Sequence, residues 1–199
     1  MGKIKSALEI ALERTDSVKS DKSSIGQFEA KQKGKKLANE YLNGNIKSLA
    51  DEIKIAPKEE QSSLKQGLFD VLISQITLPA ATEDLKRIDS AGLGLNAVIG
   101  GRKFPEISKQ LNQIMNQYLD ESAKYEDAIK RQYAPKLRSK EEELSRRMGR
   151  PVKLDPFQDP EFVAFFNQNM NTLRENYQAA INQAREEALR LFGESTASS

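Results

Sequence analysis

The stretch SRRMGRPVKLDPFQDPEF, Ser145–Phe162, lies between two long segments whose sequences have helical patterns. It contains three prolines and one glycine, and these residue types do not suit the middle of a helix. Gly149 is of the type that ends a helix, whereas Pro160, with Asp159 before it as a capping residue, suits the first turn of the next helix. The sequence therefore predicts that the chain reverses direction over 149–159.

The two segments that flank this turn share a hydrophobic period of eleven residues. In the outgoing segment the series are Ile107, Tyr118 and Ile129; Leu111, Ser122, Tyr133 and Leu144; and Met115, Glu126, Leu137 and Met148. In the return segment the series are Phe162, Leu173 and Ala184; Phe166, Tyr177 and Ala188; and Met170, Ile181 and Phe192. Eleven residues in three turns give about 3.67 residues per turn, which favours a nearly straight or slightly right-handed pair. We therefore predict an antiparallel, coiled-coil-like hairpin of two helices, 105–148 and 160–192.

A reversal over 149–159 leads to specific expectations for the contacts inside this hairpin. Near the turn we expect five apolar residues to meet, namely Leu137, Leu144, Phe162, Phe166 and Met170. Farther along, we expect Tyr118 and Ile129 to lie across from residues 181–191. Pro135 lies inside the outgoing helix, where it removes one hydrogen bond. Because the eleven-residue register continues across it, we expect a kink there, with a break of the helix as the alternative.

The first half of the chain carries the signals of several shorter helices. We predict helices over 4–20, 27–41, 46–55, 57–78 and 83–99. The polar segment SDKSSIGQ separates the first two, and Thr82 is a suitable N-cap for the last. The first helix has an apolar face that packs within the protein, on a second molecule or on a membrane, and packing within the protein is the preferred interpretation.

Together these patterns predict an all-α protein with two parts and a tail. The first part is an N-terminal helical base over 1–104. The second part is the long helical hairpin over 105–192. The tail, 193–199, consists of small and polar residues, so we expect it to be disordered.

The composition excludes several classes of chemistry. The 199 residues contain no cysteine, no histidine and no tryptophan. Disulfides, thiolate nucleophiles and metal sites built on cysteine or histidine are therefore excluded, and the commonest acid–base side chain is missing. We predict a non-enzymatic protein without a cofactor. Because the sequence has no export signal and no run of about 20 apolar residues, we also expect a cytoplasmic protein without a transmembrane segment.

Two stretches suggest ligand sites but lack the spacing that defines them. GLGLNAVIGGRK, residues 92–103, has the glycines and cations of an anion site, yet it matches neither phosphate-binding motif. A glycine-rich helix end explains it as well. DPFQDPE provides Asp155, Asp159 and Glu161, but its prolines do not permit the tight loop that calcium requires. We therefore predict no metal site.

The distal part of the hairpin is basic. Residues 130–153 contain nine Lys or Arg residues, which are opposed by three glutamates at 141–143. The residues that we predict to contact a partner are Arg146, Arg147, Arg150, Lys153 and Phe157. The preferred hypothesis is an interaction or assembly protein that presents the hairpin to a protein partner of unknown identity, and its base is a candidate for self-association into a homo-oligomer. The alternative is a nucleic-acid or anionic-surface binder, which we favour less because basic helix faces are commonly solvated surfaces.

Two stretches resemble a family that has no characterised member. The opening KIKSALEIALERT and the mid-chain SAGLGLNAVIGG are similar to sequences of uncharacterised bacterial helical proteins of unknown function. The resemblance implies a bacterial, cytoplasmic setting. It implies no activity, substrate or functional residue.

Overall fold

The computed structural model describes the backbone of residues 7–197 and the side chains of residues 24–197. Within 7–197 the chain forms α-helices, one short 3-10 helix and no strand, which confirms the predicted all-α class. The elements are α1 (Ala7–Leu42), α2 (Leu49–Ile55), α3 (Lys58–Ser74), α4 (Thr82–Ile99), α5 (Lys103–Met148), η1 (Pro156–Gln158) and α6 (Pro160–Ala197). No helix in the described part of the chain is long and apolar enough to cross a membrane.

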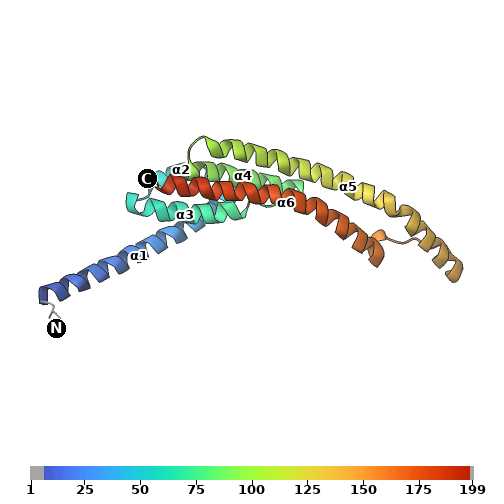
Figure 1. Ribbon diagram of the computed structural model, residues 1–199, viewed down its shortest axis with the longest axis horizontal. Helices are drawn as coiled ribbons and strands as arrows, with labels where there is room; N and C mark the ends of the chain where they lie inside the picture. Colours follow the sequence, from blue (N-terminus) through green and yellow to red (C-terminus); the bar gives the residue numbers. More distant parts are fainter. Residues whose placement is uncertain (1–6, 198–199) are drawn as a thin grey trace, which may run out of the picture. The chain divides into compact units, whose positions relative to one another are not determined.

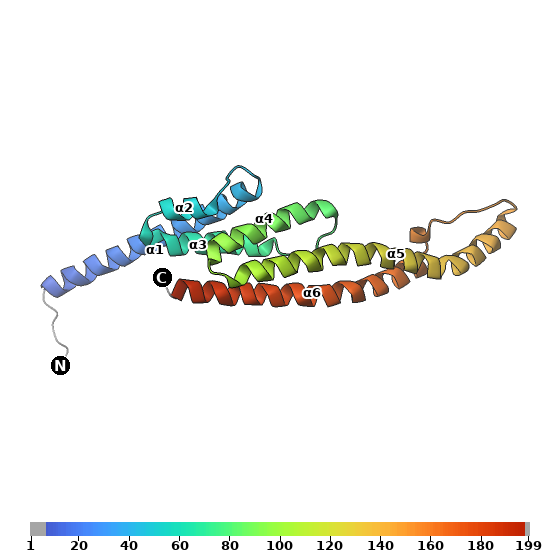
Figure 2. The same ribbon diagram turned by 90° about the horizontal axis from the view of Figure 1, so that it is seen from above.

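The predicted interruption of the first helix is wrong. α1 is one continuous helix through SDKSSIGQ, because this segment contains no proline and its single glycine, Gly26, weakens a helix by only about 1 kcal/mol. The prediction that the first helix packs within the protein concerns residues 4–20, whose side chains lie outside the described residues. Figures 1 and 2 show the N-terminal half of α1 extending away from α2 and α3.

The chain divides into two compact units, and each contains parts of α4, α5 and α6. Unit 1 consists of Met1–Ile76, Asp89–Pro105 and Ala188–Ser199, and unit 2 consists of Thr77–Ile88 and Glu106–Glu187. These units differ from the division at residue 104 that the sequence suggests. The first residues of α4 group with the long helices, and the end of α6 groups with α1–α3.

In unit 1, α1 and α3 cross at a pair of glycines. A Cβ atom on Gly34 would lie 2.2 Å from the carbonyl oxygen of Leu64, and one on Gly67 would lie 2.0 Å from that of Lys31. No side chain fits at such distances, so the two backbones approach this closely because both positions are glycine. This crossing fixes where α3 meets α1.

The rest of the core of unit 1 is built on α3. Leu64, Leu68 and Leu72 are fully buried, and the ring of Phe69 stacks on that of Phe192 with centroids 4.3 Å apart. Because Phe192 lies near the end of α6, this stack holds the C-terminal segment of the chain in unit 1. α6 continues past the predicted end at Phe192 to Ala197, so residues 193–197, which we expected to be disordered, are helical.

In unit 2, α5 is continuous across Pro135, so the alternative of a broken helix is wrong. Figure 1 shows the distal part of α5 bending away from the axis of its first part. The start of α4 differs from the prediction, because Thr82 is its first helical residue and not its N-cap. Asp84 Oδ2 instead accepts hydrogen bonds from the N–H groups of Ala80 and Ala81, at 2.8 and 3.1 Å.

The two long helices of unit 2 run antiparallel with a constant register. The rings of Tyr118 and Tyr177 have centroids 5.2 Å apart, as do those of Tyr133 and Phe162. The step from 118 to 133 in α5 equals the step from 177 back to 162 in α6. Tyr177 also donates a hydrogen bond of 2.7 Å to Glu121. Aromatic contacts and a hydrogen bond thus both occur along the interface between α5 and α6, which we call the seam.

The predicted contacts of this seam are partly wrong. Leu137, Phe166 and Met170 pack around a core cluster of Ile129, Tyr133 and Phe162, as expected near the turn. Ile129, however, lies in this cluster and not across from 181–191, and Tyr118 lies across from Tyr177. Leu144 does not join the cluster either, but lines a surface hollow of about 310 Å³ together with Leu154 and Pro160. The reason is that α6 begins beside Lys140, so the last two turns of α5, including Leu144, extend beyond the start of α6.

Candidate interaction site at the turn between α5 and α6

The connection between the long helices is longer than a tight turn, and it returns along the end of α5. α5 ends at Met148, and Gly149 has a positive φ of 65°, which a glycine adopts without strain. The chain then runs back beside α5, as Figure 2 shows. Val152 N–H donates to Ser145 Oγ at 2.8 Å, and Leu154 N–H donates to Glu141 Oε1 at 2.9 Å. We call residues 141–159, the end of α5 and this connection, the tip.

The tip ends in a short, capped 3-10 turn. Asp155 Oδ1 accepts a hydrogen bond of 3.0 Å from Phe157 N–H, which caps η1. Asp159 then accepts a hydrogen bond of 3.1 Å from Glu161 N–H at the start of α6. Asp159 is therefore the capping residue that the sequence indicated, and Asp155 has the same role one turn earlier.

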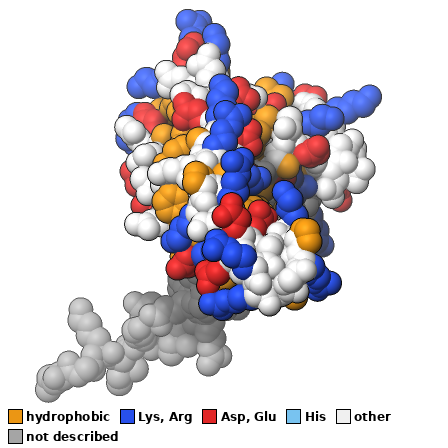
Figure 3. Space-filling model, turned by 90° about the vertical axis from the view of Figure 1, so that its right-hand side faces the viewer, with side chains coloured by type: hydrophobic (Ala, Val, Ile, Leu, Met, Phe, Trp, Pro, Cys, Tyr) orange, Lys and Arg blue, Asp and Glu red, His pale blue; other side chains and the backbone are white. Residues whose placement is uncertain are grey.

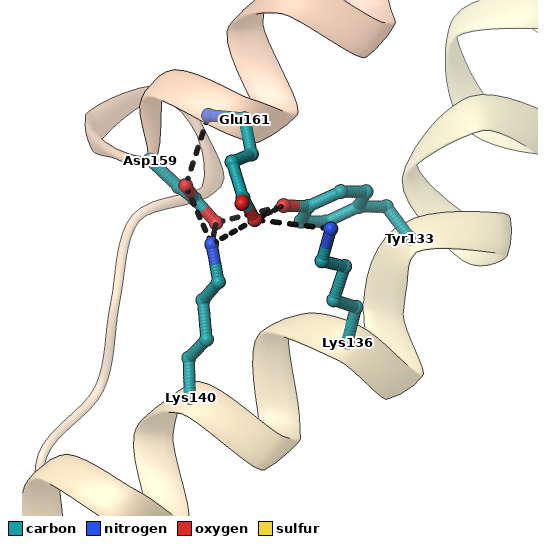
Figure 4. A network of polar contacts seen from close by, with 5 residues as sticks. All are labelled: Tyr133, Lys136, Lys140, Asp159 and Glu161. Atoms are coloured by element: carbon teal, nitrogen blue, oxygen red, sulfur yellow. Dashed lines mark hydrogen bonds and ion pairs between the residues drawn. The ribbon is translucent and has the colours of Figure 1, made fainter.

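Five charged or polar side chains join the two helices where the tip begins (Figure 4). We call this group the clasp, and its members are Tyr133, Lys136, Lys140, Asp159 and Glu161. Lys140 Nζ lies 2.7 and 2.9 Å from the two carboxylate oxygens of Asp159 and 2.6 Å from Glu161 Oε2. Tyr133 donates its hydroxyl hydrogen to Asp159 at 2.9 Å, and Lys136 Nζ lies 3.0 Å from Glu161 Oε2.

These contacts stabilise the charged forms of the lysines and carboxylates of the clasp and the neutral form of Tyr133. The hydrogen bonds from Lys140 lower the pKa of Asp159, and those from Lys140 and Lys136 lower the pKa of Glu161. The same contacts raise the pKa of Lys140 well above its usual range. Burial, together with the hydrogen bond to Asp159, raises the pKa of Tyr133. No member of the clasp therefore titrates near neutral pH, and the arrangement suits a fixed ionic connection between α5 and α6 more than proton transfer.

Phe157 lies in an aromatic group beside the clasp. Its ring packs edge-on against Phe162 and Phe166, with centroids 5.2 and 5.3 Å away. The ammonium group of Lys130 lies 5.6 Å from the centre of the same ring. Phe162 is fully buried, yet 47% of Phe157 is exposed. Phe157 is thus held in one position by its neighbours while much of its surface remains accessible.

The four cations predicted to contact a partner differ in their surroundings. Arg147 forms an ion pair of 2.6 Å with Glu143, and Arg146 lies 4.0 Å from Glu142. Arg150 and Lys153 are exposed, and neither forms an ion pair with any residue that the structure describes. All four belong to the tip, as does Phe157.

Ion pairs neutralise much of the basic charge of residues 130–153. Lys130, Lys136, Lys140, Arg146 and Arg147 all have acidic partners within 4.0 Å. Among the described side chains, Arg131, Arg138, Arg150 and Lys153 have no such partner. Figure 3, which views the molecule from the side on which the turn lies in Figure 1, shows a row of Lys and Arg side chains with Asp and Glu beside it.

The two stretches considered as ligand sites have structural roles. Asp159 and Glu161 bind Lys140, and Asp155 caps η1. Gly100 and Gly101 both have positive φ angles, 71° and 76°, and they end α4, with Gly100 N–H donating to the carbonyl of Asn96 at 3.0 Å. The described residues contain no cluster of three or more acidic side chains arranged to hold a metal ion.

Sequence reasoning missed the clasp residues of α5. Tyr133, Lys136 and Lys140 follow one another at intervals of three and four residues, which places them on one face of a helix. That spacing was a usable signal for a shared contact. Its partners were not evident, because Asp159 and Glu161 lie beyond a connection whose path the sequence does not give.

Comparison with known proteins places the chain in a family. Residues 50–190 match a family of unknown function, DUF6657, and the match covers more than half of the chain, so the protein belongs to this family. The matching region contains the clasp and the whole tip. No curated protein and no solved structure matches the chain.

Proposed function

We propose that this member of the DUF6657 family is a non-enzymatic interaction protein that presents the tip of its long helices to a protein partner. The observation that carries this proposal is the state of Phe157, which is anchored by Phe162 and Phe166 while 47% of it is exposed. Binding sites concentrate their energy in such fixed aromatic side chains, because little conformational entropy is lost when the partner binds.

The clasp supports the same proposal. It connects Lys140 of α5 with Asp159 and Glu161 at the start of α6, so the two ends of the tip are held in a fixed position relative to each other. A surface that is already ordered before binding loses less free energy on association. Met148, at the end of α5, is 52% exposed and adds a second accessible apolar side chain to the tip.

The distribution of ion pairs favours a protein partner over nucleic acid. A nucleic-acid surface needs several cations that are free to contact phosphates. Five of the nine cations in 130–153 already have acidic partners within the protein. The cations without ion pairs still provide an attractive charge for an acidic protein surface. The absence of histidine and cysteine from the sequence supports the non-enzymatic assignment.

Site-specific photo-cross-linking in the native cells tests this function. A photoreactive phenylalanine analogue replaces Met148, and the same analogue at Ile55, an exposed residue of α2 in unit 1, is the control. We expect position 148 to form a discrete cross-linked protein band that position 55 does not form. The proposal fails if the two positions give the same products. A tip-specific product that disappears on nuclease treatment would instead support the nucleic-acid alternative.

A further inference from the structure

The segment 151–155 of the tip, which follows a bend at Arg150, is extended, and it is bound to α5 along one edge. The N–H groups of Val152 and Leu154 bond to side chains of Ser145 and Glu141, respectively. Two residues of extended chain span about 6.6 Å, and four residues of helix span about 6.0 Å. The two hydrogen bonds therefore match an extended chain that runs antiparallel to α5.

Exposure along this segment alternates with the period of an extended chain. Residues 151, 153 and 155 are exposed, whereas Val152 and Leu154 are half-buried. A period of two places successive side chains on opposite faces of the chain. Asp155 has φ −73° and ψ 124°, which lies in the extended region. The exposure pattern and the hydrogen bonds thus describe the same conformation.

The second edge of the segment has unpaired backbone groups. In an extended chain, neighbouring residues direct their N–H and carbonyl groups to opposite edges. Because Val152 and Leu154 use their N–H groups toward α5, the N–H groups of Lys153 and Asp155 face the other edge. Neither of these two N–H groups forms a hydrogen bond with any described residue. The outer edge therefore offers unpaired backbone groups of the kind that the free edge of a β-sheet offers.

The charge beside this edge is positive. Arg150 and Lys153 are exposed and form no ion pair within the described part of the chain. Asp155, whose Oδ1 accepts a hydrogen bond of 3.0 Å from Phe157 N–H, contributes one negative charge against these two positive charges, so the stretch 150–155 has a net positive charge. A partner with acidic side chains therefore complements the segment, whereas a basic partner is repelled.

We propose that the outer edge of 151–155 pairs, strand to strand, with an extended acidic segment of the partner protein. The backbone groups of Lys153 and the N–H of Asp155 supply the hydrogen bonds, and Arg150 and Lys153 select for acidic residues. Pro151 has no N–H and Pro156 begins η1, so the pairing is short. This inference rests on the proposed function, because it describes the chemistry of the partner that binds the tip.

Peptide selection with the whole chain provides the test. A phage-displayed library of random peptides is selected on the wild-type protein, and the selected peptides are then measured against three variants. Lys153→Ala removes the charge and keeps the N–H, whereas Lys153→Pro removes both and is compatible with an extended backbone. Arg174→Ala, which removes an exposed cation of α6, is the control.

We expect the selected peptides to be acidic and to bind Lys153→Pro roughly tenfold more weakly than Lys153→Ala, because a hydrogen bond is lost in addition to the charge. Arg174→Ala should bind like the wild type. Equal binding by Lys153→Pro and Lys153→Ala would overturn strand pairing, while a cross-link at Met148 would still support the proposed function. Failure to select peptides whose binding depends on Lys153 would overturn the inference as well.

Amide hydrogen exchange on the wild-type protein gives a readout that does not depend on any variant. Binding of a selected acidic peptide should slow exchange at the N–H groups of Lys153 and Asp155. The N–H groups of Val152 and Leu154 should change little, because they are already bonded to α5. Protection that is absent from Lys153 and Asp155 in the complex would refute pairing at this edge.

Discussion

Lys140 Nζ lies 2.7 Å from Oδ2 of Asp159, the one buried charged residue among the side chains that the structure describes. Asp159 also accepts hydrogen bonds from Tyr133 and from the backbone of Glu161. This carboxylate thus links the outgoing helix, the end of the tip and the first turn of the return helix. Its removal leaves a lysine and a buried tyrosine hydroxyl without their main partner.

We expect Asp159→Ala to loosen the place where the two ends of the tip meet. Without the carboxylate, Lys140 and Tyr133 lose their contacts with Asp159, and only the ion pairs of Glu161 still connect α5 with α6. Amide exchange should therefore become faster over 133–140 and 157–166. Glu142→Ala removes an exposed partner that lies 4.0 Å from Arg146, and this control should leave the exchange nearly unchanged. If the two variants exchange alike, the clasp does not hold the tip.

The clasp should make stability depend on acidic pH. Hydrogen bonds from Lys140 lower the pKa of Asp159, so its stabilising contribution is complete above the ordinary aspartate pKa of about 3.9 and is lost as the pH falls through the lower value of the folded state. Urea denaturation should show wild type more stable than Asp159→Asn near neutral pH. The difference should shrink below about pH 4. A constant difference down to the acid unfolding of both proteins would contradict the lowered pKa.

The crossing of α1 and α3 should not tolerate a side chain. Gly34→Ala would place a Cβ atom 2.2 Å from the carbonyl oxygen of Leu64, and the backbones must separate to admit it. We expect a loss of about 1–3 kcal/mol in the free energy of unfolding, measured by urea denaturation. The matched control is Gly26→Ala in the same helix, which meets no atom within 4 Å and should stabilise the protein by about 0.5–1 kcal/mol. Equal effects at the two positions would mean that the close crossing does not exist.

Substitution of the aromatic residues at the turn by alanine should lower stability more where the side chain is more deeply buried. Phe162 is fully buried and contacts Tyr133, Phe157 and Phe166, so Phe162→Ala should cost about 3–5 kcal/mol. Phe157→Ala should cost clearly less, because nearly half of that side chain is already exposed to water. Chemical denaturation of both variants measures which substitution lowers the free energy of unfolding more. The reverse order would place Phe157 and not Phe162 at the centre of the cluster.

Reversing the charge of Arg146, Arg147 and Arg150 to Glu should change binding more than stability. All three side chains are exposed, and exposed ion pairs contribute at most about 1 kcal/mol each. The unfolding free energy should therefore stay close to that of the wild type, while the tip-specific cross-link from position 148 should weaken. A marked loss of stability would show that these arginines hold the tip together.

The sequence by itself determined the all-α class and the two helix boundaries that flank the turn. α5 ends at Met148 before Gly149, and α6 begins at Pro160 after Asp159, as their residue types indicate. Helix boundaries depend on local chemistry, because each backbone hydrogen bond of a helix joins residues four positions apart. The eleven-residue stripes also identified residues that are buried, including Leu111, Met115 and Ile181.

Residue types gave the helix boundaries less reliably where several weak helix-ending or capping preferences occur together. SDKSSIGQ contains residues that favour a turn, yet α1 continues through it, since none of them forbids a helix as proline does. At the start of α4 we expected Thr82 to cap the helix, but Thr82 is its first residue. The carboxylate of Asp84 reaches back instead and accepts hydrogen bonds from the N–H groups of Ala80 and Ala81, which precede the helix.

Only the tertiary structure decided how the long helices meet. The connection runs back along α5 through Val152 and Leu154, so α6 begins near Lys140 and Ile129 packs against Phe162. The register, the clasp and the exposure of Phe157 all follow from that path. A sequence pattern gives the periodicity of each helix alone, whereas the path of an irregular connection depends on contacts between residues that are distant in the chain.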